Sequence, residues 1–200
     1  MGRNIADNTA ANKQVSKAHN RFDYSPIIDR PPLRWPNGAR VAVWVIPNIE
    51  HFYFDRPAHA IAHATRGFVP DVHNYSWRDY GVRVGIWRVM EIMQRYGIRG
   101  TVALNSDCCR EYPRIIEEGK KLGWEWMGHG TSNSILLSGL AEREERAIIK
   151  ETVDTITACV GTAPRGWLSP ALSETARTLD ILAEHGIEYV GDWTNDEQPY

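Results

Sequence analysis

Short apolar runs recur along the chain, and each predicts one strand of a sheet. The first run, from Ala39 to Ile46, reads Ala-Arg-Val-Ala-Val-Trp-Val-Ile. Nearly continuous apolar sequence with β-branched residues is typical of a strand that is buried on both faces of a parallel sheet. Four more runs predict strands, and they span Ile98–Leu104, Trp124–Met127, Arg165–Pro170 with its loop, and Ile187–Gly191.

Segments with helical periodicity lie between these runs. The predicted helices are Val82–Tyr96, Glu111–Leu122, Leu140–Val160, and one that Ser173 caps and that stops at Gly186. In the first of them, Ile86, Met90 and Met93 share one face. The third has an apolar face formed by Ile148, Thr152, Ile156 and Cys159. Strands that alternate with helices indicate an α/β fold with a parallel sheet, either wound into a barrel or left open.

Two segments show neither helical nor strand periodicity. Residues 1–29 are polar and mixed in charge, and we interpret them as an arm that packs on the domain or on a neighbouring subunit, which leaves residues 30–200 as one domain. Phe52–Tyr80 is long, aromatic and rich in histidine and proline. Since a loop of that length inside a compact domain is usually functional, we expect it to cover the pocket.

Composition narrows the choice of partner and compartment. The formal net charge is -2, with 23 basic and 25 acidic residues spread along the chain, and this balance favours neither nucleic acid nor an anionic membrane as a partner. A small-molecule substrate is the expected partner. The three cysteines have neither a disulfide pattern nor zinc-site spacing. Because no apolar run resembles a signal segment or a membrane span, we expect a cytoplasmic protein.

Polar side chains gather where the predicted strands end. The candidates at or just after a carboxyl end are Asn48, Glu50, Asn105, Asp107, His129, Arg165, Asp192 and Trp193. In α/β barrels and in doubly wound sheets alike, that edge carries the active site. His129 stands between Gly128 and Gly130, which let the backbone turn so that the ring can project into a cleft.

These residues resemble the motifs of the polysaccharide deacetylase superfamily, and more closely its allantoinase-like branch. The resemblance runs from about Arg30 to Tyr200 and rests on five pieces: Trp35–Arg40 with Asn48-Ile49-Glu50, Asn105-Ser106-Asp107, Met127–Gly130, Arg165-Gly166-Trp167 and Gly191–Asp196. It implies a distorted (β/α) barrel with fewer than eight strands. It also implies a hydrolase that cleaves a carbon–nitrogen bond other than a peptide bond.

The sequence departs from the metal-dependent deacetylases of this superfamily, which carry two aspartates after the first strand and a histidine pair four residues apart after the third. Here Asn48 and Glu50 stand in the first two places, and His129 is followed at that spacing by Asn133. Because an amide is a poor substitute for imidazole or carboxylate, we expect no metal cofactor. The allantoinase-like branch shares the Asn-x-Glu pattern, which makes a small cyclic ureide or imide the expected substrate.

Two other classes of function stay open. One is a metal-dependent N-deacetylase of an acetylated amino sugar or polysaccharide, in which Glu50 and His129 would bind a divalent ion such as zinc with a ligand from elsewhere. The other is a non-catalytic ligand-binding or assembly protein that kept the fold. Five strands are few for a closed barrel, so the chain is a fragment, or another chain of a homo-oligomer supplies the remaining strands, or the sheet stays open.

The hydrolase interpretation gives each candidate a role. Glu50 or Asp107 would deprotonate water, and His129 would donate a proton to the departing nitrogen. Arg165 would stabilise the oxyanion or bind a substrate carbonyl while Asp192 orients it. The predicted substrate contacts are Asn48, Asn105, Asn133, Arg165, Trp167, Asp192 and Trp193, with the two tryptophans as platforms for a planar ring.

Several of these roles have a structural alternative. Asp107 could cap the helix that follows it. Arg165 and Asp192 could form an ion pair at the rim of the domain without taking part in catalysis. Trp167 and Trp193 could be core aromatics.

Overall fold

The computed structural model describes residues 19, 21–57 and 62–199. These residues divide into two compact units, of which the larger is residues 42–196 and the smaller comprises the flanking residues on either side. The smaller unit contains two single-turn 3-10 helices, Ile27–Asp29 and Pro36–Gly38. Most of the predicted arm, residues 1–18 and 20, lies outside the described residues. All the candidate site residues lie in the larger unit.

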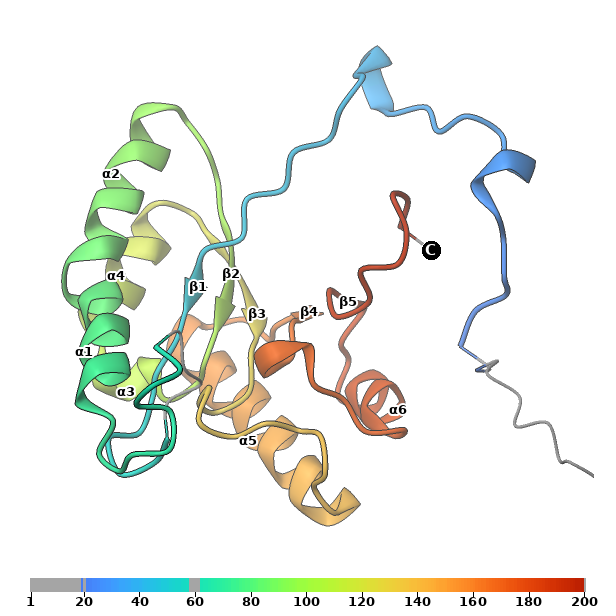
Figure 1. The fold of residues 1–200 in the computed structure, drawn as a ribbon. Coiled ribbons are helices and arrows are strands. Elements are labelled where there is room, and N and C mark those ends of the chain that lie inside the picture. Colours follow the sequence, from blue (N-terminus) through green and yellow to red (C-terminus); the bar gives the residue numbers. More distant parts are fainter. Residues whose placement is uncertain (1–18, 20, 58–61, 200) are drawn as a thin grey trace, which may run out of the picture. The chain divides into compact units, whose positions relative to one another are not determined.

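The larger unit is built on a parallel sheet of five strands in the order β1-β2-β3-β4-β5 (Figure 1). The strands are β1 Asn48–Ile49, β2 Thr101–Leu104, β3 Glu125–Gly128, β4 Gly166–Trp167 and β5 Tyr189–Val190. Each pairs in parallel with the next strand along the chain, so their carboxyl ends meet at one edge of the sheet. The described strands leave the sheet open between β1 and β5. The predicted α/β class with a parallel, incompletely closed sheet is confirmed.

The first predicted strand is wrong in both extent and burial. Only Asn48–Ile49 forms β1, although the carbonyl groups of Val45 and Pro47 still accept hydrogen bonds from strand β2 at 3.1 Å each. Val43 is 82% exposed and Trp44 is 52% exposed, whereas the apolar run predicted burial on both faces. The reason is that β1 pairs with β2 alone among the described strands, so the segment before it is covered incompletely.

Helices connect the strands. Their bounds are α1 Val72–Tyr80, α2 Ile86–Arg95, α3 Cys108–Glu111, α4 Pro113–Lys121, α5 Glu142–Val160 and α6 Thr178–Glu184. A π-helical segment, Gly81–Gly85, joins α1 to α2. The predicted helices therefore all occur, with shifted ends. Among the described helices none combines the length and the apolar character that a membrane span needs.

Two helix boundaries differ from the prediction for a physical reason. Part of the expected loop forms α1, because Asp71 caps this helix by accepting a hydrogen bond from the Asn74 amide at 3.2 Å. Ser173 does not cap α6. Its hydroxyl donates to the carbonyl of Pro170 at 2.7 Å, so it closes the preceding turn and α6 begins only at Thr178.

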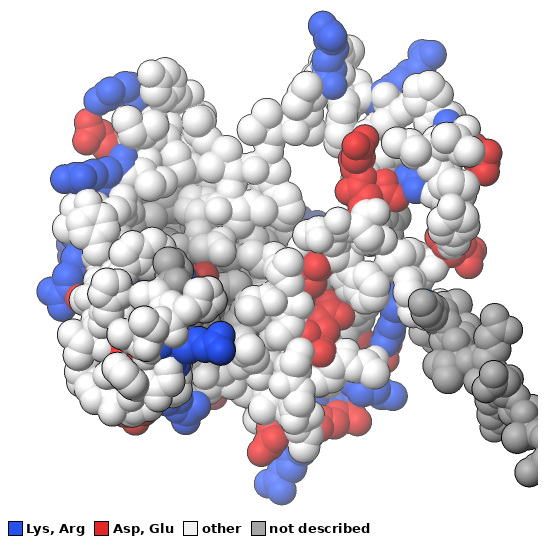
Figure 2. Space-filling view, in the orientation of Figure 1, with Lys and Arg blue, Asp and Glu red and all other residues white. Residues whose placement is uncertain are grey.

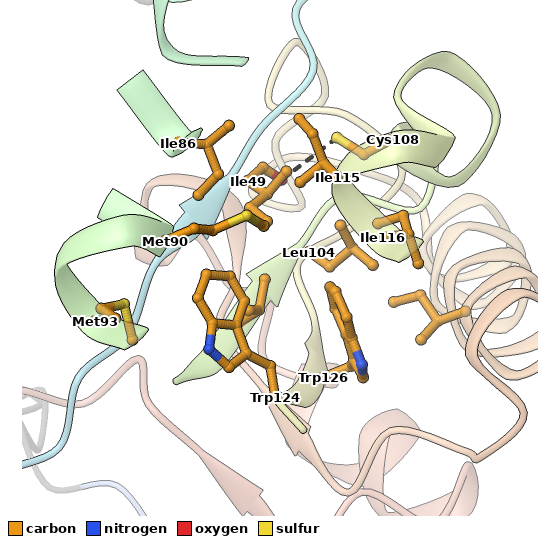
Figure 3. Close-up of a cluster of buried hydrophobic side chains, with 12 residues drawn as sticks. Ile49, Ile86, Met90, Met93, Leu104, Cys108, Ile115, Ile116, Trp124 and Trp126 are labelled. Atoms are coloured by element: carbon orange, nitrogen blue, oxygen red, sulfur yellow. Dashed lines mark hydrogen bonds between the residues drawn. The ribbon is translucent and has the colours of Figure 1, made fainter. Parts of the chain in front are cut away.

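Two apolar clusters hold the helices on the sheet. Figure 3 shows the cluster that joins β1, β2 and the segment around β3 to α2, α3, α4 and α5. Its buried members are Ile49, Ile86, Met90, Met93, Val102, Leu104, Cys108, Ile115, Ile116, Trp124, Trp126 and Ile156. The second cluster joins β4 to α5 and α6, with Leu137, Ile149, Val153, Trp167, Ile181, Leu182 and Ile187. The predicted apolar face of α2 is thus confirmed.

The buried face of α5 is rotated slightly from the predicted one. Thr152 and Ile156 are buried as expected, together with Ile149 and Val153, whereas the predicted Ile148 and Cys159 are only half-buried. The carboxylate of Glu145 on the same face is also buried, and it accepts hydrogen bonds from the hydroxyls of Thr175 and Thr178. This contact joins α5 to the start of α6.

Gly119 in α4 makes the packing of this core testable. A Cβ added at Gly119 would lie 2.6 Å from the ring of Trp126 and 3.3 Å from the ring of Trp124. Alanine is the better helix former by about 1 kcal/mol, but overpacking a core costs about 1–3 kcal/mol. Since both indoles are buried and cannot yield freely, we expect Gly119→Ala to lower the free energy of unfolding by about 1 kcal/mol, measured by urea denaturation.

Gly81 provides the matched control, because a Cβ added there would meet no atom within 4 Å. Gly81→Ala should therefore leave the free energy of unfolding unchanged or raise it by about 0.5–1 kcal/mol. A Gly119→Ala variant at least as stable as the wild type would contradict the packing of the two tryptophans against α4.

Candidate functional site

His129 follows β3 directly, and its ring is held in one orientation. The side chain is 2% exposed, and Nδ1 bonds to the carbonyl oxygen of Leu168. Because a carbonyl oxygen can only accept, Nδ1 must carry a proton. The nitrogen left available for proton exchange is then Nε2, which faces Oε1 of Glu50 at 3.5 Å and has no hydrogen-bond partner among the described residues.

The two glycines beside His129 act as the sequence predicts, each for a different reason. Gly130 has a φ of 68°, a conformation that other residues rarely adopt. A Cβ at Gly128 would overlap the indole ring of Trp167. The turn after β3 and the close approach of β4 both therefore depend on glycine.

Glu50 lies just after β1, between two basic side chains. Oε1 faces His129, and Oε2 lies 3.6 Å from Nη1 of Arg78. Burial raises the pKa of this carboxyl, but the contact with His129, the charge of Arg78 and a hydrogen bond from Asn133 together outweigh it and leave the pKa below its usual range. Glu50 is thus ionised at neutral pH and can accept a proton.

Asn105 connects the loops at the carboxyl edge of the sheet. Its Oδ1 accepts hydrogen bonds from the amides of His51 at 2.9 Å and Asn133 at 3.1 Å. Its Nδ2 donates to Oδ1 of Asn133 at 3.0 Å and to the carbonyl of His129. With all these bonds made inside the protein, Asn105 and Asn133 hold Glu50 and His129 in place, and their predicted contact with substrate stays a prediction.

Asp107 stands at the start of α3, but its carboxylate does not cap that helix. The capping alternative is therefore wrong. Oδ2 accepts a hydrogen bond from the hydroxyl of Tyr53 at 2.8 Å, and Oδ1 lies 3.5 Å from Nη2 of Arg110. Burial, followed by the hydrogen bond and the charge of Asp107, raises the pKa of Tyr53 to about 12. The partners of Asp107 are Tyr53 and Arg110, whereas Glu50 faces Nε2 of His129, so Glu50 is the better-placed base.

Arg165 and Asp192 do not meet, so the expected pairing of the two is wrong. Arg165 precedes β4 and lies at the amino edge of the sheet, where Nε bonds to Oε1 of Glu188 at 2.8 Å and Nη2 to Oε2. The parallel register of β4 and β5 places Glu188 opposite Arg165. Asp192 follows β5 at the other edge and accepts a hydrogen bond from the amide of Ser169 at 2.6 Å. Arg165 therefore cannot stabilise an oxyanion near His129.

The two candidate tryptophans have different surroundings. Trp167 is fully buried in the second apolar cluster and donates from Nε1 to the hydroxyl of Ser169 at 2.9 Å, so it is a core aromatic and the platform prediction is wrong for it. Trp193 is 38% exposed and lines a separate cavity of about 320 Å³ with Asp192 and Glu174. Its role as a platform stays a prediction.

A cleft of about 480 Å³ opens beside Glu50, between β1 and the helical run from α1 to α2. Asn48 and Glu50 line it from the strand, and Trp77, Arg78 and Tyr80 line it from the helices. A concave site with a few convergent polar groups is typical of small-molecule binding.

The surface charge is mixed. On the face shown in Figure 2, basic and acidic side chains are interspersed and most of the surface is uncharged.

The sequence did not identify Arg78 or Tyr53, although both contact candidate catalytic carboxylates. Arg78 lies within the stretch that lacked a clean period, and Tyr53 meets a residue 54 positions away. The signal that could have found Arg78 is the cap at Asp71, which predicts a helix through this stretch. No local signal indicates the partner of Tyr53.

Glu50 and His129 are the candidate metal ligands at this site. In the part of the chain that the structure describes, no group of three or more His, Cys, Asp or Glu side chains is arranged to hold a metal ion. Asn133 offers only an amide, and its oxygen already accepts from Asn105. This donor set does not fit a site with three strong protein ligands, so a metal bound here would need ligands from substrate, solvent or another segment.

The adjacent cysteines belong to the packing. Cys108 is buried, and its Sγ contacts the carbonyl oxygen of Ile49 at 3.4 Å (Figure 3). Burial raises the pKa of the thiols of Cys108 and Cys109 far above the usual range. A protonated thiol is a weak nucleophile, so the surroundings of both cysteines favour a structural role.

Comparison with known proteins identifies a family and a set of similar folds. The family described as polysaccharide deacetylase matches residues 74–190. A Schizosaccharomyces pombe protein assigned to the polysaccharide deacetylases is 23% identical over 185 residues, which are 83% of this chain and 57% of that protein. A solved structure with the same assignment, from Pseudomonas aeruginosa PAO1, has a TM-score of 0.72 and 23% identity, and the match covers 86% of this chain and 61% of that one.

The solved structure of Puue allantoinase is similar to the same degree. Its TM-score is 0.70 at 23% identity, with 90% of this chain and 64% of that chain covered. At these identities the likeness shows the fold. The chain thus spans 57% of the length of the S. pombe relative and less than two thirds of either solved chain. The family match includes His129 but begins after Glu50.

Proposed function

The chain belongs to the polysaccharide deacetylase family, and from this membership we propose that it hydrolyses a carbon–nitrogen bond other than a peptide bond, with Glu50 as general base and His129 as general acid. One observation carries the proposal. The ionised carboxylate of Glu50 faces Nε2 of the buried His129 imidazole at 3.5 Å, at the edge of the sheet where α/β enzymes react. Catalytic contacts are often this long before substrate binds.

The proposed reaction uses only these two side chains for proton transfer. Glu50 takes a proton from water as the water oxygen bonds to the carbonyl carbon, and the carbonyl electron pair moves onto its oxygen. His129 begins the reaction with a proton on both ring nitrogens. When the electron pair returns, the carbon–nitrogen bond breaks and the departing nitrogen takes the proton from Nε2 of His129. Glu50 then passes its proton to Nε2, which restores both groups. Positioned acid–base groups of this kind accelerate a reaction by about 10²–10⁴-fold each.

The first proposed substrate is an N-acetylated amino sugar, from which hydrolysis would release acetate. The family's description and the assignment of the S. pombe relative support this choice. The cleft beside Glu50 also supports it, because Trp77 and Tyr80 are half-exposed aromatics on its wall. Aromatic faces with an adjacent polar group suit a ring that has both apolar and hydroxyl surfaces.

A small cyclic ureide is the second candidate. It is favoured by the donor set, since Asn48 and Asn133 carry amides where the resemblance places metal-binding or basic groups in deacetylases. A ring amide could be opened by the same Glu50 and His129 steps.

Product analysis separates the two candidates. Purified protein is incubated with tetra-N-acetylchitotetraose, and released acetate is measured. Parallel reactions contain allantoin or hydantoin, and ring opening is followed by the loss of substrate. We expect acetate release by the wild type and none above background by Glu50→Gln. Ring opening without acetate release would establish the second candidate, and the absence of both would reject hydrolysis of these classes.

Each reaction is repeated after dialysis against a chelator and again after zinc is added back. Activity that survives the chelator agrees with the acid–base proposal. Activity that is lost and then restored by zinc would assign Glu50 and His129 to a metal and reject the two-residue mechanism.

A further inference from the structure

Arg78 is held beside Glu50 by contacts that fix the position of its guanidinium. Nη1 lies 3.6 Å from Oε2 of Glu50. The guanidinium carbon lies 4.7 Å from the ring centre of Phe52 and 5.2 Å from that of Trp77. Stacking on aromatic rings suits the planar, weakly hydrated guanidinium of arginine better than the ammonium of lysine.

The surrounding fold determines where Arg78 lies. Asp71 caps α1, and the buried side chain of Asn74 bonds to the carbonyl of Ala62 at 3.2 Å. These contacts anchor the first turn of the helix, and Arg78 lies near its other end, one turn before the π-helical segment Gly81–Gly85. Segments of π-helix are frequent at functional sites, where they alter the register of a helix.

Glu50 is therefore contacted on two sides by groups from different parts of the fold. His129 faces Oε1 from the end of β3, and Arg78 faces Oε2 from α1. Arg78 and Glu50 both line the cleft beside β1. With one oxygen opposite each group, the carboxylate has a preferred rotation in which Oε1 points at His129.

We propose that Arg78 is the positioning residue of this site, which holds the carboxylate of Glu50 in the orientation that proton transfer with His129 requires. The role in catalysis rests on the proposed hydrolase function. The arginine that the sequence suggested, Arg165, is paired with Glu188 at the opposite edge of the sheet. Arg78 therefore acts through Glu50, which is a different role from the oxyanion contact expected of Arg165.

Kinetics on Arg78 variants test the proposal with the substrate that the wild type hydrolyses. We expect Arg78→Ala to lower kcat by about 10–100-fold with little change in KM. The reason is that a misoriented Glu50 carboxylate slows the chemical step more than it weakens substrate binding. Arg78→Lys should recover part of the loss, since it restores the charge but not the planar stack. Added guanidinium chloride at low concentration should raise the kcat of Arg78→Ala, whereas equal potassium chloride should not.

Arg83 is the matched control. It lies on the same helical run, is largely exposed and pairs with Asp79, so Arg83→Ala should retain the wild-type kcat. Loss of activity in Arg78→Ala that neither lysine nor guanidinium restores would overturn the positioning role, as would an unchanged kcat.

A readout without substrate separates this proposal from the proposed function. The ¹⁵N chemical shift of His129 Nε2, at fixed pH, reports the carboxylate that faces it. If Arg78 orients Glu50, Arg78→Ala should move this shift in the same direction as Glu50→Gln does, and Arg83→Ala should leave it unchanged. An unmoved shift in Arg78→Ala rejects the proposal even where no hydrolysis is found.

Discussion

Replacing His129 with alanine is expected to lower the kcat of acetate release by about 10²–10⁴-fold, the contribution of one positioned acid–base group. The reason is geometric. Nδ1 is committed to the carbonyl of Leu168, so Nε2 is the nitrogen that exchanges protons, and it faces Glu50 at 3.5 Å. Steady-state kinetics at neutral pH measure the loss, and if ring opening is the activity found, its rate takes the place of acetate release.

The same substitution has a structural cost that must be separated from the catalytic one. His129 is 2% exposed, so alanine leaves a cavity and an unpaired carbonyl at Leu168, and we expect a loss of about 1–3 kcal/mol in the free energy of unfolding. His129→Gln keeps volume and a side-chain donor. It should lose as much kcat as His129→Ala with a smaller loss of stability.

His73 on α1 is exposed and serves as the control. His73→Ala should change neither kcat nor the free energy of unfolding. Unchanged turnover in both His129 variants would eliminate the assignment of the acid. A loss of turnover that follows the loss of stability, with folded His129→Gln fully active, would assign His129 a structural role.

Sequence patterns predicted the architecture well, because strands that are buried on both faces of a parallel sheet consist mainly of apolar residues. The runs that became β2 and β3 are apolar where both faces are covered, and the helices between them show one apolar side. The first strand shows the limit of this reasoning. A run such as Val43-Trp44-Val45 does not encode how many neighbours the strand has, and here only one described strand pairs with β1.

The candidate site could be predicted in part. Glu50 and His129 were found because the residue after a parallel strand is at the reactive edge whatever the tertiary details. Arg165 was misplaced because it was grouped with residues at the carboxyl ends, although the predicted strand begins with it; it lies just before β4, at the amino edge of the sheet. Arg78 was missed because its partner is fixed by the packing of α1, which no local pattern specifies.

Glu50→Gln should lower kcat by about 10²-fold or more, because glutamine keeps the shape of the side chain but cannot accept a proton. Glu91, whose exposed carboxylate pairs with Arg95, is the matched control, and Glu91→Gln should retain full activity. Glu50→Asp keeps the charge but withdraws it from His129, so its kcat should lie between those of the wild type and Glu50→Gln.

The pH dependence of the wild type tests the same residue independently. The pKa of Glu50 lies below its ordinary value of 4.5, since the contacts with His129, Arg78 and Asn133 outweigh burial. The acid limb of kcat/KM should therefore fall below pH 4.5, as Glu50 takes up a proton.

The same shift makes stability depend on pH. Because the folded-state pKa of Glu50 is depressed, the ionised group stabilises the fold above its unfolded-state pKa, and this contribution is lost as pH falls through the folded-state value. The stability difference between wild type and Glu50→Gln should shrink over that interval in urea titrations. An acid limb above pH 5, or a Glu50→Gln variant with wild-type kcat, would remove Glu50 from the role of base and leave Asp107 as the carboxylate to test next.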